Sequence, residues 1–404
     1  MSDTLVMRAP VQPSERIVSL DILRGLALFG MLIVHFADHA AEGAGLAGSA
    51  LEAVQLLVSG RAYATFALLF GAGFALQLAR ARSRGAPFTA TYLRRLGVLA
   101  LFGAIAHGLF GFNVLLGYAV WGTVLLVVQR WSTRVLVVLA VLTSYGSATY
   151  NLGLMRFMRQ TMTLPERTAA YAAMGADFEA GWALLDEARY QPTLAAAVPY
   201  RIRHMAWFYR QAWFVGMGLH LFLWGMVGVR LGFFESPQRH LRPIAAVAGA
   251  GLVTCAAWLL WQSIELEWQG ALLYWVTSPW SEWLMFFYIG VVLLLLAKSR
   301  AAARWLSWFA PPGRAALTNY FIQIVTIDLL LSRYGLGLGE FAAWAVIPAA
   351  VAMFGLQLLA SRWWFGRYQL GPLEWVWRGL TYGRRPAFLR LAPVTAAPLA
   401  PAEP

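Results

Sequence analysis

Residues 17–36 read IVSLDILRGLALFGMLIVHF, an apolar stretch long enough to cross a lipid bilayer as one helix. Only Asp21, Arg24 and His35 interrupt it with side chains that can carry charge. A backbone inside hydrocarbon must satisfy its own hydrogen bonds, so this stretch predicts a transmembrane helix. It lacks a small-residue cleavage site, which argues against a signal peptide that is removed.

Comparable apolar stretches recur along the chain as far as residue 361. The 404 residues are 60% hydrophobic and 13% charged, and a soluble domain of that composition could not cover its surface with polar groups. The predicted fold is all-α, a polytopic integral membrane protein of about ten transmembrane helices. Their expected positions are 17–37, 53–79, 92–111, 114–130, 133–151, 207–230, 243–262, 280–297, 314–332 and 341–361.

Most of the 32 Lys and Arg residues fall in short clusters between alternate apolar stretches. Because cytoplasmic loops are enriched in Lys and Arg, this pattern places both termini in the cytoplasm. The net charge of +13 is thereby explained by topology, and no nucleic-acid partner is expected. The expected surroundings are the lipid bilayer of the bacterial cytoplasmic (inner) membrane.

The same pattern divides the chain into five parts. They are a cytoplasmic segment at 1–15, a five-helix half at 16–151, an outer loop at 152–206, a second five-helix half with an interfacial helix at 207–390, and a disordered tail at 391–404. Within the loop, Leu164-Pro165-Glu166 predicts the start of an amphipathic helix through Ala169 to Arg189. A connector is favoured there over a lid, and both readings stay open.

Ionisable residues inside predicted spans need a partner or a task, since insertion of one costs about 2.5–3.5 kcal/mol. Asp21 and Arg24 are three residues apart on one helix face and can pair. They form either a local ion pair or the cytoplasmic floor of a polar cavity.

Near the predicted outer face, successive helices carry His35, Arg61 and His107, and Asn113 and Tyr118 follow closely as predicted binding residues. A neutral imidazole can act as a general base, and a guanidinium can stabilise an oxyanion. His35, Arg61 and His107 are therefore predicted to form a catalytic cluster. A metal site at His35 and His39 is a weak alternative without an accompanying Glu, so no metal or prosthetic group is predicted.

The C-terminal half adds two polar motifs. Asn319 and Gln323 share one helix face beside Tyr320, where they serve either as packing contacts or as ligand contacts. After the break at Gly371-Pro372, Glu374 and Arg378 stand four residues apart in an aromatic stretch that predicts an interfacial helix.

Four stretches together resemble the YeiB-like bacterial membrane family, whose C-terminal half is catalogued as domain of unknown function 418. They are Leu20 to Gly25, Leu69 to Phe74, Gly313 to Tyr320, and Gly371 to Tyr382. That family is similar to the transmembrane acyltransferases, which include the lysosomal heparan N-acetyltransferase and bacterial sugar O-acyltransferases. The resemblance implies about ten or eleven spans and transfer of an acyl group, commonly acetyl from acetyl-CoA, across the membrane.

In that resemblance Asp21, Arg24 and His35 occupy comparable places. The family often carries Asn where His35 stands and Asp where Asn113 stands, which makes His107 the safer candidate base. The leading hypothesis is thus a membrane acyltransferase that uses acyl-CoA (acetyl-CoA) and a small-molecule or glycan acceptor. Asp21, Arg24, Glu374 and Arg378 would form its donor entrance. The alternative is a transporter or exporter of a small metabolite. The oligomeric state is open, a homodimer being one option.

Overall fold

The computed structural model describes residues 16–111, 113–211, 218–262 and 280–389. Over these residues it contains helices and two isolated bridges but no strand, so the predicted all-α class is confirmed. In chain order the helices are α2 (Val18–Ala37), α3 (Gly45–Leu57), α4 (Arg61–Ser83), α5 (Thr89–Phe110), α6 (Leu115–Val128), α7 (Thr133–Ser144), α8 (Gly146–Thr161), α9 (Leu164–Arg189), α10 (Leu194–Phe208), α11 (Leu219–Arg230), η3 (Pro237–His240), α12 (Leu241–Gln262), α14 (Trp280–Lys298), α15 (Arg300–Leu306), η4 (Ser307–Phe309), α16 (Ala310–Arg314), α17 (Ala316–Leu331), η5 (Ala343–Ala345), α18 (Val346–Arg367) and α19 (Pro372–Tyr382).

Length and composition identify this chain as a membrane protein. Among the described residues, five helical stretches are long and apolar enough to cross a bilayer, and seven if two bent helix pairs each count as one span. Helices α6 and α11 are apolar but have only 14 and 12 residues, short of the roughly 20 that a full crossing needs. These criteria therefore support fewer crossings than the predicted ten.

Several predicted spans are interrupted in the structure. The range 53–79 is broken at Gly60, whose φ of 75° is unfavourable for other residues, so α3 and α4 are separate helices. The range 314–332 contains a 75° bend near its start, between Arg314 at the end of α16 and Ala316 at the start of α17. Both breaks lie beside polar residues discussed below, namely Arg61 and Arg314.

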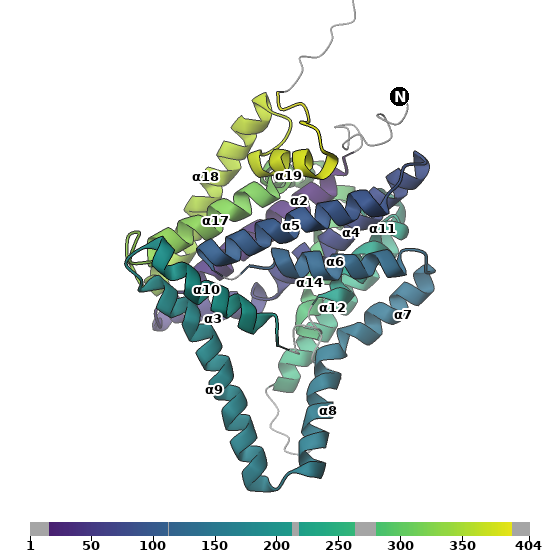
Figure 1. The fold of residues 1–404 in the computed structure, drawn as a ribbon. Helices are drawn as coiled ribbons and strands as arrows, with labels where there is room; N and C mark the ends of the chain where they lie inside the picture. Colours follow the sequence, from purple (N-terminus) through teal and green to yellow (C-terminus); the bar gives the residue numbers. More distant parts are fainter. Residues whose placement is uncertain (1–15, 112, 212–217, 263–279, 390–404) are drawn as a thin grey trace, which may run out of the picture.

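Helix α2 lies at the centre of the bundle. Its Leu28 and Leu32 are fully buried, and it packs against α4, α16, α17 and α18. Figure 1 shows α8 and α9 projecting from the bundle as the two arms of a V, whereas α19 lies near the opposite end. The centre of the molecule is therefore formed by elements from both sequence halves.

The helix predicted to start near Leu164 is present as α9, and its amphipathic placement on the outer surface stays a prediction. It starts at Leu164, with Pro165 in the first turn and a reciprocal capping box between Thr163 and Glu166. Hydrogen bonds from Thr163 hold the pKa of the Glu166 carboxyl below its usual range. The second loop helix, α10, was not predicted. The helix predicted after Gly371 is present as α19, and its interfacial position stays a prediction.

Small residues allow α4 and α11 to pack closely. A Cβ on Gly225 of α11 would lie 1.9 Å from the carbonyl oxygen of Leu68, and one on Gly71 would lie 2.0 Å from that of Phe222. Gly71 belongs to the small-residue stretch Phe70-Gly71-Ala72-Gly73-Phe74 and lets α4 approach α11 closely.

Gly225→Ala is expected to lower the free energy of unfolding by about 1–3 kcal/mol, because the added methyl group overlaps the α4 backbone. Gly249→Ala on α12 is the matched control, since a Cβ there meets nothing within 4 Å. The control should gain up to about 1 kcal/mol from the better helix propensity of Ala. Thermal unfolding in detergent measures both variants, and equal losses in the two would contradict this packing argument.

Candidate functional site

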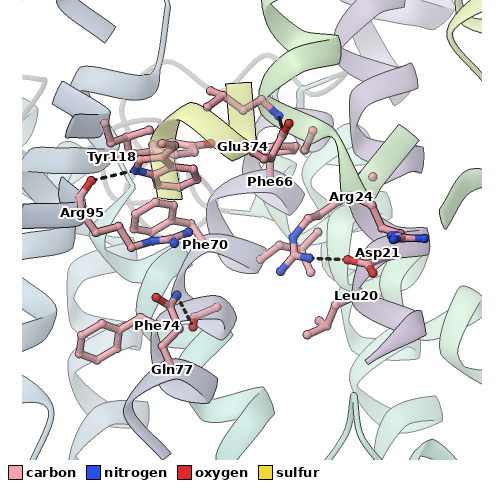
Figure 2. Close-up of a pocket in the computed structure, with 18 of the residues that line it drawn as sticks. Leu20, Asp21, Arg24, Phe66, Phe70, Phe74, Gln77, Arg95, Tyr118 and Glu374 are labelled. Atoms are coloured by element: carbon pink, nitrogen blue, oxygen red, sulfur yellow. Dashed lines mark hydrogen bonds and ion pairs between the residues drawn. The ribbon is translucent and has the colours of Figure 1, made fainter. Parts of the chain in front are cut away.

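A cavity of about 250 Å³ opens between α2, α4, α5, α6, α17 and α19. Figure 2 labels lining residues of α2, α4, α5, α6 and α19 around it. Its polar and aromatic lining consists of Arg16, Asp21, Arg24, Phe66, Phe70, Phe74, Gln77, Arg80, Tyr92, Arg95, Tyr118, Arg314, Tyr320, Glu374, Trp377, Arg378 and Tyr382. The lining includes all four residues predicted to form the donor entrance, namely Asp21, Arg24, Glu374 and Arg378.

Positive charge dominates this lining. Six arginines face two carboxylates, Asp21 and Glu374. The predicted pair of Asp21 and Arg24 is confirmed, with 2.7 Å between Oδ1 and the guanidinium, and Arg16 approaches the same carboxylate at 3.8 Å. One carboxylate therefore neutralises only part of the charge around it, and the cavity suits an anionic ligand.

Arg95 and Arg378 lie at the junction of α5 and α19. The Arg95 guanidinium lies 3.8 Å from the ring centroid of Trp377, whose Nε1 donates a hydrogen bond to the Arg95 carbonyl oxygen. Burial, together with the nearby charges of Arg16 and Arg95, lowers the pKa of Arg378 to about 10. Crowded, desolvated guanidinium groups favour an anion that restores their lost solvation.

Glu374 connects α19 to the start of α17. Its Oε1 accepts hydrogen bonds from the backbone N–H groups of Leu317 (2.7 Å) and Thr318 (3.2 Å), and its Oε2 accepts one from the Thr318 hydroxyl (2.6 Å). A carboxylate is favourable at a helix N-terminus. Burial nonetheless raises the pKa of Glu374 above its usual value. Glu374 thus fixes one wall of the cavity.

The family-like stretches meet at this cavity because their glycines permit close contact. A Cβ on Gly25 would lie 2.0 Å from the carbonyl oxygen of Phe309, and one on Gly313 would lie 1.9 Å from that of Asp21. A Cβ on Gly371 would lie 2.2 Å from the Glu374 carboxylate. The Asp21 and Glu374 motifs therefore adjoin across the α16–α17 segment.

Aromatic rings line the interior of the cavity. Tyr118 is buried, packs against Phe66 and Phe70, and donates a 3.4 Å hydrogen bond to the Tyr63 carbonyl oxygen. Tyr320 enters from α17. Tyr118 and Tyr320 were both predicted as binding residues, and both line the cavity.

His35 lies beside this aromatic region. It follows the lining residue Met31 by one helical turn, and its ring centroid is 6.2 Å from that of Tyr320. Its Nε2 atom is buried and has no hydrogen-bond partner among the described residues. An unpaired buried ring nitrogen is available to a hydroxyl or amine that enters the site.

His107 is in a different environment. It is fully buried, and its Nε2 lies 2.9 Å from Nδ1 of His204 on α10. It does not line the cavity. The structure therefore does not bring His107 and His35 together around this cavity, as the sequence had suggested.

Arg61 is also outside the cavity lining. One amino group donates to the carbonyl oxygens of Ser59 (2.6 Å) and Gln55 (3.5 Å), while Nε and the other amino group are buried without partners among the described residues. Arg61 therefore keeps unpaired N–H donors, but these donors are not part of the cavity lining.

Three predicted binding residues make structural hydrogen bonds instead. Asn113 donates to the Gly103 carbonyl oxygen and accepts from the Leu115 N–H at the start of α6. Asn319 donates a hydrogen bond to Ser361, and Gln323 donates one to Gln357. Both bonds join α17 to α18. Of the two readings left open for the α17 amides, these contacts favour packing.

The metal alternative gains no support from geometry. Among the described residues no group of three or more His, Cys, Asp and Glu side chains could hold a metal ion. His39 instead lies 3.0 Å from the Arg189 guanidinium, and Asp38 accepts a hydrogen bond from Gln55.

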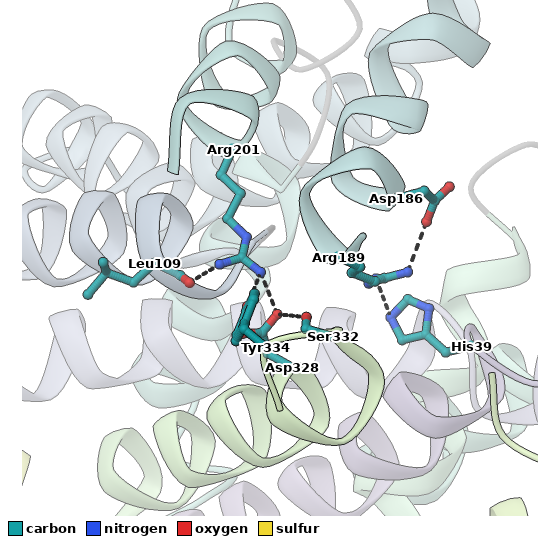
Figure 3. Close-up of polar contacts among 8 residues, drawn as sticks. All are labelled: His39, Leu109, Asp186, Arg189, Arg201, Asp328, Ser332 and Tyr334. Carbon is teal, nitrogen blue, oxygen red and sulfur yellow. Dashed lines mark hydrogen bonds and ion pairs between the residues drawn. The ribbon is translucent and has the colours of Figure 1, made fainter. Parts of the chain in front are cut away.

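A buried ion pair that the sequence reasoning missed ties α10 to α17. Arg201 lies 2.5 Å from Asp328, and their side chains are only 2% and 4% exposed. Tyr334 and Ser332 also donate to Asp328, and Arg201 donates to the Leu109 carbonyl oxygen (Figure 3). The predicted spans of the C-terminal half contain two acidic residues, Glu282 and Asp328. Asp328 could have been identified from the sequence because an acid inside a span needs a partner.

Three arginines of the cavity were also not predicted from the sequence as site residues. Arg80, Arg95 and Arg314 were treated as topological charges at helix ends, yet all three line the cavity. Their clustering was visible, but a sequence does not distinguish a solvated arginine from one that lines a site.

Comparisons with known proteins agree with the predicted resemblance. Residues 16–167 match the family described as heparan-alpha-glucosaminide N-acetyltransferase, catalytic, and residues 228–384 match the protein of unknown function (DUF418) family. The chain is 27% identical over 403 residues to the uncharacterized protein YxaH of Bacillus subtilis (strain 168), covering 92% of this chain and 96% of YxaH. It is 26% identical over 398 residues to the uncharacterized protein YeiB of Escherichia coli (strain K12), covering 91% and 96%.

No solved structure matches the chain. The likeness to YeiB-like proteins, and an acyltransferase-like relation in the N-terminal half, are confirmed. The four helices α2, α4, α5 and α6, which supply much of the cavity wall, all lie within the stretch that matches the acetyltransferase family.

Proposed function

We propose that this protein is a membrane-embedded acyltransferase that moves an acyl group, such as acetyl, from an acyl-CoA donor to a small or envelope-associated acceptor. The observation that carries the proposal is a cavity with an arginine-rich wall and an aromatic interior that ends beside His35. Arginines bind the phosphates of such a donor, and the aromatic interior receives its acyl thioester.

In this proposal His35 is the general base, in preference to His107. His35 has an unpaired Nε2 and lies next to Tyr320, which lines the cavity. His107 instead lies within hydrogen-bond distance of His204. The base removes the proton from an acceptor hydroxyl or amine as that group attacks the thioester carbonyl carbon. The C–S bond breaks, and the departing thiolate takes up a proton. Arg61 stays a candidate for holding a charged part of the acceptor.

The proposed topology has ten crossings, both termini in the cytoplasm and the arginine-rich end of the cavity facing the cytoplasm of a bacterial inner membrane. Each predicted span overlaps a helix of the structure, and the basic clusters support the orientation. Reporter fusions at both termini test it, because an active periplasmic reporter at either end would contradict the orientation.

Donor binding is tested by titrating the purified protein with acetyl-CoA in a calorimeter. We expect Arg24→Gln to weaken binding by roughly ten- to hundredfold, because it removes a charged hydrogen-bond donor from the cavity. Arg156→Gln on exposed α8 is the matched control and should bind as the unaltered protein does. Absence of binding to the unaltered protein would refute an acyl-CoA donor.

A transporter of an anionic metabolite is the second candidate, because an arginine-lined cavity recognises an anion whether or not the anion reacts. Flux of such a metabolite into proteoliposomes without any acyl donor, together with no acyl transfer, would favour it.

A further inference from the structure

We propose that an anionic phospholipid binds to a tryptophan and arginine patch beside the cavity. The patch consists of Arg304, Trp305 and Trp308 on α15 and η4, and Arg362, Trp363 and Arg367 at the end of α18. None of these six residues lines the cavity, so the inference stands apart from the proposed acyl transfer.

The two parts of the patch are in direct contact. The Arg362 guanidinium lies 3.8 Å from the ring centroid of Trp308, and that of Arg367 lies 4.6 Å from the ring centroid of Trp363. A guanidinium stacked on an indole is held in place while its N–H edge stays free for a phosphate.

The exposure of the tryptophans identifies the surroundings as lipid. Trp305, Trp363 and Trp308 are 76%, 56% and 40% exposed. Indole rings are enriched at the level of lipid headgroups, where the ring contacts acyl chains and the N–H contacts water. Three exposed tryptophans beside exposed arginines therefore fit a headgroup with its adjoining chains better than they fit free phosphate.

The charge of this region favours an anionic partner. Residues 283–327 and 341–373 contain no Asp or Glu, so no carboxylate in either stretch can neutralise the patch. Anionic lipids attract juxtamembrane basic residues by about 1 kcal/mol each, which is about fivefold in affinity. The patch also adjoins the cavity, because Arg314, a lining residue, stacks on Phe365 at 4.0 Å.

The test compares two triple variants of the full chain in nanodiscs of phosphatidylcholine with phosphatidylglycerol. R304Q/R362Q/R367Q removes the patch arginines. R156Q/R159Q/R203Q removes three exposed arginines from α8 and α10, one of them also stacked on an aromatic ring, Tyr200. Native mass spectrometry then counts the phosphatidylglycerol molecules retained by each protein, and thermal unfolding checks that both variants fold.

We expect the unaltered protein and the control variant to retain phosphatidylglycerol, and the patch variant to lose about fivefold in affinity per arginine. High salt should reduce retention as well. Equal retention by all three proteins would overturn the proposal. Equal loss in both variants would overturn it too, since retention would then reflect total charge.

Discussion

Asp328→Asn is expected to lower the free energy of unfolding by about 3–5 kcal/mol, the usual cost of breaking a buried ion pair by removing one partner. The substitution keeps the shape of the side chain and leaves the Arg201 charge without compensation. Because Arg201 is only 2% exposed at its side chain, water cannot replace the lost carboxylate. The loss is therefore expected to exceed that of an ordinary surface substitution.

The same pair connects parts of the molecule that build the cavity. Arg201 on α10 contacts α17 through Asp328 and α5 through the Leu109 carbonyl oxygen. Helix α5 supplies Arg95 and α17 supplies Tyr320 to the cavity lining. Loosening this contact is thus expected to weaken donor binding as well as stability.

Thermal unfolding of the purified variants in detergent measures the effect. Arg201→Met combined with Asp328→Leu is the informative control, because replacing both charges with apolar groups removes the uncompensated charge and should recover most of the loss. Arg156→Gln controls for the loss of an exposed arginine. If Asp328→Asn unfolds at the temperature of the unaltered protein, the ion pair contributes little to stability.

Much of the helical framework was predictable because apolar stretches report directly on burial in lipid. The start of α9 was also predictable, since Thr163, Pro165 and Glu166 form a local capping motif. The breaks were harder. Gly60 separates α3 from α4 within an apolar stretch whose composition alone does not reveal the turn.

The site was predictable in part for a related reason. Asp21 and Arg24 are one turn apart, so their pairing follows from helix geometry. Glu374 and Thr318, in contrast, are 56 residues apart, and Arg201 and Asp328 are 127 apart. Such contacts depend on how helices pack. For the same reason the sequence could not tell that His107 contacts His204, whereas His35 contacts Tyr320.

His35→Gln is expected to reduce donor-dependent acyl transfer by roughly 10²–10⁴-fold, the usual contribution of a general base. Glutamine keeps a polar side chain of similar reach but cannot take up a proton at neutral pH. Affinity for acetyl-CoA should stay within a few-fold, because the lining arginines proposed to bind its phosphates are unchanged in this variant. Transfer is measured as incorporation of labelled acetyl groups into membrane or envelope material of cells that express each variant.

His107→Gln is the matched control, since it makes the same chemical change at the other candidate base. It leaves His204 buried beside an altered partner, so it is expected to lower thermal stability while folded protein keeps most of its transfer rate. The opposite result, with transfer abolished in folded His107→Gln and retained in His35→Gln, would assign the base to His107. Loss of donor binding in His35→Gln would instead place His35 in recognition of the donor rather than in proton transfer.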